Sequence, residues 1–428
     1  MSGNDLQKAL RYRWLIFWIL AFGYILVYFH RLCPAVVAVD MMRDLKTGGG
    51  LTGLLGAAYF YPYALMQLPA GLLSDSWGPR RTITLFFAVA VVGSCLLGMA
   101  PNALWAIVGR TLVGIGVAML FVPTMKVLAE WFRVREFAMM TGILMAVGGG
   151  GSLVAATPLA VLSSAIGWRW SFIAVGGFTL ILAVLVWLLV RDRPADFGWP
   201  APPEDTGVAS PGAIGLWDGV RRVLTRAAFW PIAVWFFFEM AVFFSFGGLW
   251  GGPYLMHVYG MTKAQASKVL SMMAIGMIVG SPLLSYLSNN LFRARKPVMV
   301  ISSGIVLVLT ALLAFRTEVL GSTALYLICL GFGVFGSAIV VIGFTSNKEL
   351  FPVRMAGTAT GLVNLFPFAG GAVFQPILGL VLEHHGRTGS SFNAAGYHQA
   401  FVLLFICAAV ALTASLFMKE TLAKPSAG

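Results

Sequence analysis

The stretch Gly71-Leu72-Leu73-Ser74-Asp75-Ser76-Trp77-Gly78-Pro79-Arg80-Arg81 lies between two long apolar runs. Gly71 and Gly78 allow two helix ends to approach each other closely. Asp75 is able to cap a helix N-terminus or to pair with a cation. Arg80 and Arg81 are typical of the cytoplasmic side of a membrane helix. The stretch therefore predicts a short cytoplasmic turn between two membrane-spanning helices.

The composition predicts an all-α membrane protein. The chain has 428 residues, of which 59% are hydrophobic and 11% are charged, so a soluble core cannot bury its apolar surface. A spanning helix needs about 20 apolar residues, so the chain accommodates about twelve such helices with short loops. A membrane enzyme or a receptor with a large soluble domain would require a long polar stretch, which the sequence lacks.

The apolar runs divide into two sets of six with a linker between them. We expect an N-terminal six-helix bundle over residues 1–190, a cytoplasmic linker over 191–228, and a C-terminal six-helix bundle over 229–428. The helices are expected at residues 14–39, 51–73, 80–100, 103–128, 137–162, 168–190, 229–256, 265–288, 297–315, 321–346, 356–382 and 398–418.

The formal charge of +13 indicates how the chain is oriented in the membrane. Most basic residues fall in loops of one parity, which places both termini in the cytoplasm and the chain in the cytoplasmic (inner) membrane. The partners expected are therefore the lipid bilayer and a small solute, and no nucleic acid. The four cysteines lie in apolar segments without metal-ligand spacing, so neither a metal nor another cofactor is expected. We expect a monomer.

The two halves repeat each other weakly. The repeated pairs are residues 72–75 and 283–286, 130–135 and 349–354, 141–142 and 360–361, and 167–172 and 396–401. Parallel six-helix repeats with a binding site between them are an architecture of secondary transporters.

Three motifs resemble those of the major facilitator superfamily of secondary transporters. They are the loop over residues 71–81, the run Gly-Arg-Thr-Leu-Val-Gly-Ile-Gly over 109–116, and the helix entry over 167–172. The resemblance implies a major facilitator fold of 12 transmembrane helices in two pseudo-symmetric six-helix bundles. It also implies that Gly71, Asp75, Gly78, Arg80 and Arg81 form a conformational latch. The second half lacks this latch, with Tyr286 where an Asp is expected.

Arg31 is one of few ionisable residues deep in an apolar segment, where an unpaired charge costs several kcal/mol. Tyr24, Tyr28 and Arg31 lie at positions i, i+4 and i+7, on one helical face. A guanidinium beside two phenols suits a carboxylate or phosphate, since it donates two parallel hydrogen bonds. The alternative is that Arg31 pairs with an acid of the other half and ties the two halves together.

The run Gly-Tyr-Ile-Leu-Val-Tyr-Phe-His-Arg over residues 23–31 also resembles the first helix of the organophosphate:phosphate antiporters, in which a Gly-Tyr pair precedes a substrate-binding Arg. The resemblance implies an anionic substrate. Those antiporters carry a second Arg in helix 7, near the position of Phe246. A single Arg is better suited to a monoanion than to a phosphate dianion.

Glu239 in the seventh predicted helix shares one face with Phe243, Phe246 and Trp250. A carboxyl group among aromatic side chains is able to take a proton from one side and release it to the other as the site is re-solvated. Its alternative role is a static salt bridge to an arginine of the first half. Trp250 is expected to contact the substrate.

Asn364, Phe368, Gly371 and Gln375 form a stripe on the eleventh predicted helix. The two amides are able to bind polar substituents of a ligand, and equally to join helices to each other.

Arg110 corresponds to an arginine that, in relatives, is associated either with proton coupling or with bonds to neighbouring backbone. Tyr59, Tyr63 and Gln67 form a stripe that either reaches the cavity or belongs to the core.

These observations predict a secondary transporter that moves a small organic anion of the monocarboxylate type by alternating access, coupled to protons or to sodium. An amino acid or short-peptide transporter and a siderophore or drug exporter are alternatives. A sensor that has lost transport is a more remote one. The sequence offers no nucleophile and base pair and no phosphate loop, so no enzymatic activity is expected.

Overall fold

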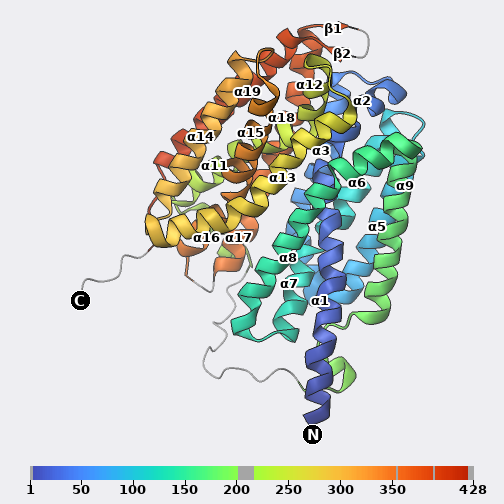
Figure 1. The fold of residues 1–428 in the computed structure, drawn as a ribbon. Coiled ribbons are helices and arrows are strands. Elements are labelled where there is room, and N and C mark those ends of the chain that lie inside the picture. Colours follow the sequence, from blue (N-terminus) through green and yellow to red (C-terminus); the bar gives the residue numbers. More distant parts are fainter. Residues whose placement is uncertain (1–2, 201–215, 353–354, 389–390, 423–428) are drawn as a thin grey trace. The chain divides into compact units, whose positions relative to one another are not determined.

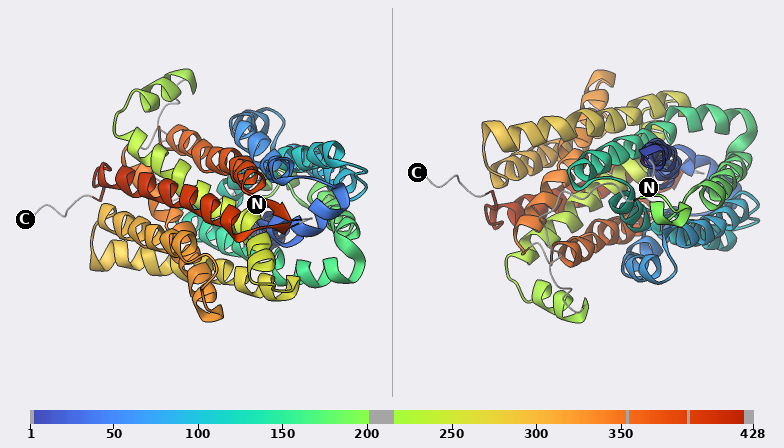
Figure 2. Two further views of the ribbon diagram at one scale, coloured as in Figure 1. Left: turned by 90° about the horizontal axis from the view of Figure 1, so that it is seen from above. Right: turned by 90° about the horizontal axis from the view of Figure 1, so that it is seen from below.

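The structure is a computed structural model that describes residues 3–200, 216–352, 355–388 and 391–422. Nearly every described element is a helix (Figure 1), which confirms the all-α prediction. By its internal contacts the chain divides into two units, Met1–Arg31 with Tyr61–Ala209 and Leu32–Phe60 with Ser210–Gly428. Figure 2 shows that each unit is a bundle of helices. Residues 201–215 of the predicted linker lie outside the described part.

The first unit is built around α5, which packs against both α6 and α9. Its elements are α1 (Gly3–Leu32), α4 (Gln67–Ser76), α5 (Pro79–Gly98), α6 (Ala103–Ala118), α7 (Phe121–Trp131), α8 (Val134–Val154), α9 (Thr157–Leu189) and the short η1 (Pro194–Phe197).

The second unit is built around α11, which packs against α18 and α19, and α14, which packs against α19. Its helices are α2 (Pro34–Leu45), most of α3 (Gly49–Leu65), α10 (Leu216–Leu224), α11 (Phe229–Ser245), α12 (Gly251–Val258), α13 (Lys263–Tyr286), α14 (Lys296–Phe315), α15 (Ser322–Gly331), α16 (Val340–Glu349), α17 (Ala356–Val363), α18 (Leu365–His384) and α19 (Ala394–Leu416). Three π-helical turns, η2 (Phe246–Trp250), η3 (Leu287–Leu291) and η4 (Phe332–Ala338), interrupt these helices, and β1 (Arg387–Thr388) pairs with β2 (Ser391–Phe392).

Ten helical runs among the described residues are long and apolar enough to cross a membrane. The fifth predicted helix is represented by a shorter apolar helix, Met139–Val154. The second predicted helix is present as α3 and α4, divided near Met66. The order of helices along the chain therefore agrees with the predicted twelve.

Prolines set two breaks that the predicted ranges missed, and a glycine sets one that falls between two predicted helices. The first predicted helix is divided into α1 and α2 before Pro34. The fifth ends at Val154, and α9 starts at Thr157 with Pro158 in its first turn, where a proline needs no N–H partner. Inside α9 the backbone is non-helical at Gly167, with φ 81°. This kink lies between the predicted fifth and sixth helices.

In the second unit, α2 and α3 pack against α12 and α18 with almost no side chains between them. A Cβ atom added at Gly252 would lie 1.6 Å from the carbonyl oxygen of Ala35. One added at Gly49 would lie 2.1 Å from the carbonyl oxygen of Gly379, and one at Gly53 would lie 2.5 Å from a carbonyl oxygen of α18. Glycine is therefore required for this backbone contact.

Two charged contacts flank the same packing. The Gly50 N–H at the start of α3 donates to Glu383 Oε2 at 3.1 Å, so a carboxylate satisfies one of the unpaired N–H groups of that helix end. The ammonium group of Lys263 contacts the carboxylate of Asp40.

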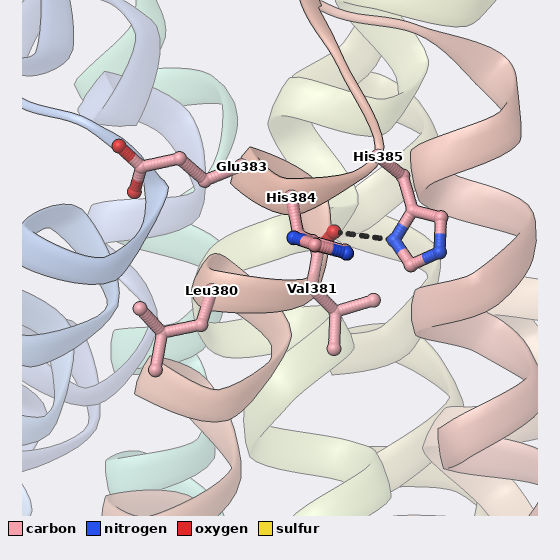
Figure 3. Close-up of a pocket in the computed structure, with 5 residues that line it drawn as sticks. All are labelled: Leu380, Val381, Glu383, His384 and His385. Atoms are coloured by element: carbon pink, nitrogen blue, oxygen red, sulfur yellow. Dashed lines mark hydrogen bonds between the residues drawn. The ribbon is translucent and has the colours of Figure 1, made fainter.

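Figure 3 shows the end of α18, where a surface pocket is lined by Leu380, Val381, Glu383, His384 and His385.

We expect Gly252→Ala to destabilise the protein by about 1–3 kcal/mol, because the added methyl group overlaps the Ala35 carbonyl and forces α2 and α12 apart. The measurement is the thermal unfolding midpoint of the purified protein, followed by tryptophan fluorescence. The control is Gly304→Ala in α14, where a Cβ meets no described atom within 4 Å. Equal midpoints for the two variants would contradict the requirement for close contact.

Candidate functional site

Arg31 lies at the end of α1 and is 7% exposed. Its Nη2 donates to the hydroxyl of Tyr63 at 2.7 Å. Its Cζ lies 4.7 Å from the ring centroid of Tyr28 and 4.9 Å from that of Tyr63. The guanidinium is thus held by two phenol rings, each of which attracts a cation through its face.

Tyr24 continues this stripe into the core of the first unit. Its ring stacks on Phe121 at 5.6 Å and meets the edge of Tyr28 at 5.5 Å. A Cβ at Gly148 in α8 would lie 2.5 Å from the Tyr24 ring. The packing of α8 on α1 therefore fixes the orientation of Tyr24, and through it that of Tyr28.

Tyr63 is the residue of this cluster that the sequence did not assign to the site. It was expected either to reach the cavity or to pack in the core, and it is both buried and bonded to Arg31. The amide of Gln67 donates to the Tyr63 carbonyl at 3.3 Å. The i, i+4 spacing of Tyr59, Tyr63 and Gln67 was the available signal, but spacing alone does not show which helix the stripe faces.

Arg110 in α6 donates from Nη1 and Nη2 to the carbonyl oxygen of His30, at 3.2 and 3.1 Å. In a regular helix this carbonyl accepts from the N–H four residues later, and that residue is Pro34, which has none. Arg110 therefore supplies the donors that the helix lacks at the residue before Arg31. This geometry favours backbone bonding, one of the two roles expected for Arg110.

The five predicted latch residues lie at and near the turn between α4 and α5. Asp75 accepts from Lys126 Nζ at 2.6 Å. Gly78 has φ 86°, a conformation that side chains rarely adopt. Arg81 is exposed, and a Cβ at Gly71 meets no described atom within 4 Å.

Asp192 was not predicted to belong to this turn. Its Oδ1 accepts from the Arg80 N–H at 2.7 Å, at the N-terminus of α5. Burial raises the pKa of Asp192, while the hydrogen bond from Arg80 opposes this shift. The Arg80 side chain lies over the ring of Trp187 at 4.4 Å and donates from Nε to the Trp187 carbonyl at 2.8 Å.

In the second unit, Glu239 lies in α11 and is 1% exposed. Its Oε2 accepts from the hydroxyl of Ser303 at 3.4 Å, and that hydroxyl oxygen accepts from Trp235 Nε1 at 2.8 Å. Its Oε1 has no hydrogen-bond partner within the described residues. Ser303 was not predicted, because nothing in the sequence indicated that α14 faces α11 at this level.

The side chain of Trp250 bonds to the backbone of Gln375, and the side chain of Gln375 bonds to the backbone of α11. Trp250 Nε1 donates to the Gln375 carbonyl at 2.9 Å, and Gln375 Nε2 donates to the Phe244 carbonyl at 2.8 Å. The ring of Phe368 stacks on Phe244 at 5.9 Å. Asn364 lies between α17 and α18 and is partly buried. The stripe on α18 therefore faces α11 for most of its length.

A family model described as the Major Facilitator Superfamily matches residues 20–375 and 250–427. The chain belongs to this superfamily. The predicted family, fold and multi-pass membrane character are thereby confirmed, and its family and the relatives it resembles are transporters, not enzymes.

Several curated relatives of this superfamily member align over nearly its whole length. The probable sulfoacetate transporter SauU of Cupriavidus necator is 23% identical, over 97% of this chain and 96% of its own. A probable hexose phosphate transport protein of Chlamydia trachomatis is 23% identical, over 95% and 91%. The probable galactarate/D-glucarate transporter GudP of Escherichia coli is 22% identical, over 96% of each chain.

Solved structures support the fold. A bacterial homologue of the human lysosomal transporter Spinster superposes with a TM-score of 0.76 at 20% identity, over 95% of this chain and 97% of that one. The nucleoside transporter NupG, solved as a point mutant, superposes with a TM-score of 0.71 at 14% identity, over 93% and 99%.

We expect Pro34→Ala to reduce the cost of Arg110→Met. In the parent chain, Arg110→Met leaves the buried His30 carbonyl without these donors, at about 1–3 kcal/mol. Alanine at position 34 offers a backbone N–H that can replace them. The measurement is a double-mutant cycle of thermal unfolding midpoints. Strictly additive effects would contradict the compensation.

Proposed function

We propose that this chain is a secondary transporter for small organic anions of the monocarboxylate type and that its uptake is coupled to protons. The observation that carries the proposal is the buried Arg31, held between the rings of Tyr28 and Tyr63. Relatives named for sulfoacetate, hexose phosphate and galactarate/D-glucarate support an anionic substrate. A hexuronate transporter of Escherichia coli, 23% identical over 89% of this chain, supports it further.

Arg31 would hold one anionic group of the substrate. The faces of aromatic rings attract a cation, and the donors of a guanidinium match the two oxygens of a carboxylate. The hydroxyl of Tyr63 fixes the guanidinium from one side. Tyr24 and Tyr28 would orient the substrate, and Trp250, Asn364 and Gln375 would contact its polar substituents. A solute with one carboxylate, such as a hexuronate, fits a single arginine best.

Glu239 would bind the coupled proton. A carboxylate buried to 1% exposure is costly to keep charged, and a neutral carboxylic acid at this depth is not. A hydroxyl such as that of Ser303 serves both forms, because it donates to a carboxylate and also accepts from a carboxylic acid. Glu239 is therefore suited to change its protonation state as water reaches it and leaves it.

Alternating access would use the glycine packing in the second unit. Charged contacts at Glu383 and Asp40 hold α2 and α3 against α18 and α13. The contact is backbone to backbone. It can therefore exclude water when it is closed, and it can open without the withdrawal of large side chains. The expected location is the inner membrane, with these contacts at the outer side.

We expect Arg31→Ala to reduce uptake of D-glucuronate into liposomes by at least about tenfold, because hydrogen bonds to a charged group are worth about 1.5–3 kcal/mol. Uptake is compared for sulfoacetate, D-glucarate, D-glucuronate and glucose 6-phosphate, with D-glucose as the neutral solute. Tyr63→Phe should raise KM by up to about tenfold, since it removes the hydrogen bond that Arg31 donates to the Tyr63 hydroxyl but keeps the ring and the charge of Arg31. Arg222→Ala, at an exposed arginine of α10, is the control. Unchanged anion uptake by Arg31→Ala would exclude this anchor.

We expect Glu239→Gln to abolish accumulation driven by a proton gradient and to retain exchange of labelled for unlabelled substrate. Glutamine keeps the size and one acceptor but cannot release a proton, so only the coupled step is lost. Both processes are measured in the same liposomes, with an imposed pH gradient or with none. Glu318→Gln, at an exposed glutamate, is the control. Gradient-driven accumulation that survives in Glu239→Gln would refute the assignment.

A further inference from the structure

We propose that Glu239 exchanges its proton with water along a polar seam between α14 and α16, inside the second unit. The seam consists of Ser302 and Ser303 on α14, Asn347 on α16, and the Arg295–Glu349 ion pair at its far end. This proposal rests on the proton role of Glu239. It adds that the proton follows a route through one bundle, separate from the arginine that binds the anion.

The seam begins deep in the second unit, at the contact between Glu239 and Ser303. Ser303 Oγ lies 3.4 Å from Glu239 Oε2 and 2.8 Å from Trp235 Nε1. The ring of Trp235 packs against α16, since a Cβ at Gly343 would lie 2.7 Å from it. Gly343 has no side chain, so α16 comes close to the residues that surround Glu239.

Contacts then continue along both helices toward the start of α14. Ser303, Met299 and Arg295 lie four residues apart, so they follow one face of α14 over about 12 Å. Ser346 Oγ lies 3.8 Å from Met299 Sδ. Arg295 Nη2 lies 3.0 Å from Glu349 Oε1. The two helices therefore run past each other in opposite directions from Glu239 to this ion pair.

Two residues of the seam carry buried polar atoms that the described residues do not satisfy. Ser302 Oγ has no hydrogen-bond partner there, and neither amide atom of Asn347 has one. Asn347 is 0% exposed and lies one helical turn beyond Gly343. Burying such groups without partners is unfavourable, and groups of this kind are commonly satisfied by bridging water. With bridging water between them, these groups would be able to carry a hydrogen-bonded path, because a hydroxyl and an amide both donate and accept.

The end of the seam farthest from Glu239 is charged and partly exposed. The side chain of Glu349 is 27% exposed. Arg295 also donates to Ser288 Oγ at 3.0 Å, and Thr421 donates to Glu349 Oε2 at 2.6 Å. This end carries Lys296 and neighbouring basic residues, on the side expected to face the cytoplasm. It is the point at which the seam would meet bulk water.

The step conserves atoms and charge. One proton leaves the carboxyl oxygen of Glu239 and passes along hydrogen bonds among bridging waters and the hydroxyls of Ser302 and Ser303, with Asn347 holding a bridging water in place. One proton enters water beside Glu349. Glu239 is left as a carboxylate that accepts from Ser303. No bond between heavy atoms changes, and no co-reactant is needed.

The test is the rate at which Glu239 loses its proton after a rapid rise in pH. Time-resolved infrared spectroscopy of the full-length protein in lipid nanodiscs follows the carboxylic acid C=O band that Glu239→Gln removes. We expect Asn347→Leu and Ser302→Ala to slow the loss of this band by at least about tenfold. Thr310→Val is the matched control, since Thr310 is buried on the same helix and its hydroxyl bonds to the Val306 carbonyl of its own helix.

The outcomes separate this route from the proposed function. Slowing in both seam variants, with Thr310→Val as fast as the parent chain, supports the seam. A band that disappears as fast in Asn347→Leu and Ser302→Ala as in the parent chain overturns the seam and leaves Glu239 as a proton site. If no band that Glu239→Gln removes responds to pH, the proton role itself fails, and the seam fails with it. Ser302→Ala keeps the test decisive if Asn347→Leu does not fold.

Discussion

The carbonyl oxygen of His30 accepts two hydrogen bonds from Arg110 because Pro34 offers it none. A buried carbonyl must be satisfied, so the break in the first membrane helix requires a donor from elsewhere in the bundle. Arg31 is the next residue, and the chain leaves the first unit directly after it. The missing N–H thus leaves a carbonyl that Arg110 satisfies at the residue before the candidate anchor.

Arg31 and Glu239 each contact hydroxyl groups within their own unit. Phenol rings and a hydroxyl contact Arg31, and a serine hydroxyl contacts Glu239. Hydroxyls and ring faces stabilise a charge less than an opposite charge does. An anion would satisfy the arginine and a proton would satisfy the carboxylate. The division of these residues between two units is what a carrier requires if anion and proton are to be coupled by motion of its halves.

The sequence predicted the fold well because each apolar run is long enough to span a bilayer, and no tertiary contact is needed to recognise it. It failed at helix breaks, where local geometry decides. The first helix was predicted unbroken through Pro34, and the fifth was extended through Pro158. It also failed for Tyr63, Ser303 and Asp192, which were not assigned to a site. Each of these acquires its partner from another helix or loop, and one sequence does not record which faces meet.

The two halves also resemble each other in one hydrogen-bonded contact. In each half, a carboxylate after the last helix accepts from the start of the third helix. Asp192, after the last helix of the first half, accepts from the Arg80 N–H at the start of α5. Glu420, after the last helix of the second half, accepts from the Lys296 N–H at 3.0 Å, at the start of α14.

Both α5 and α14 are the third helix of their half, and each begins with a proline in its first turn. A proline there leaves the remaining unpaired N–H groups open to an acceptor, and a carboxylate also complements the positive end of the helix. The second half has Tyr286 where the first has an aspartate, so the echo in the loop sequence is imperfect. A carboxylate nevertheless accepts from the first turn of the third helix in both halves. In the second half this carboxylate fixes the end of α14 beside Arg295, where the proposed proton route would open.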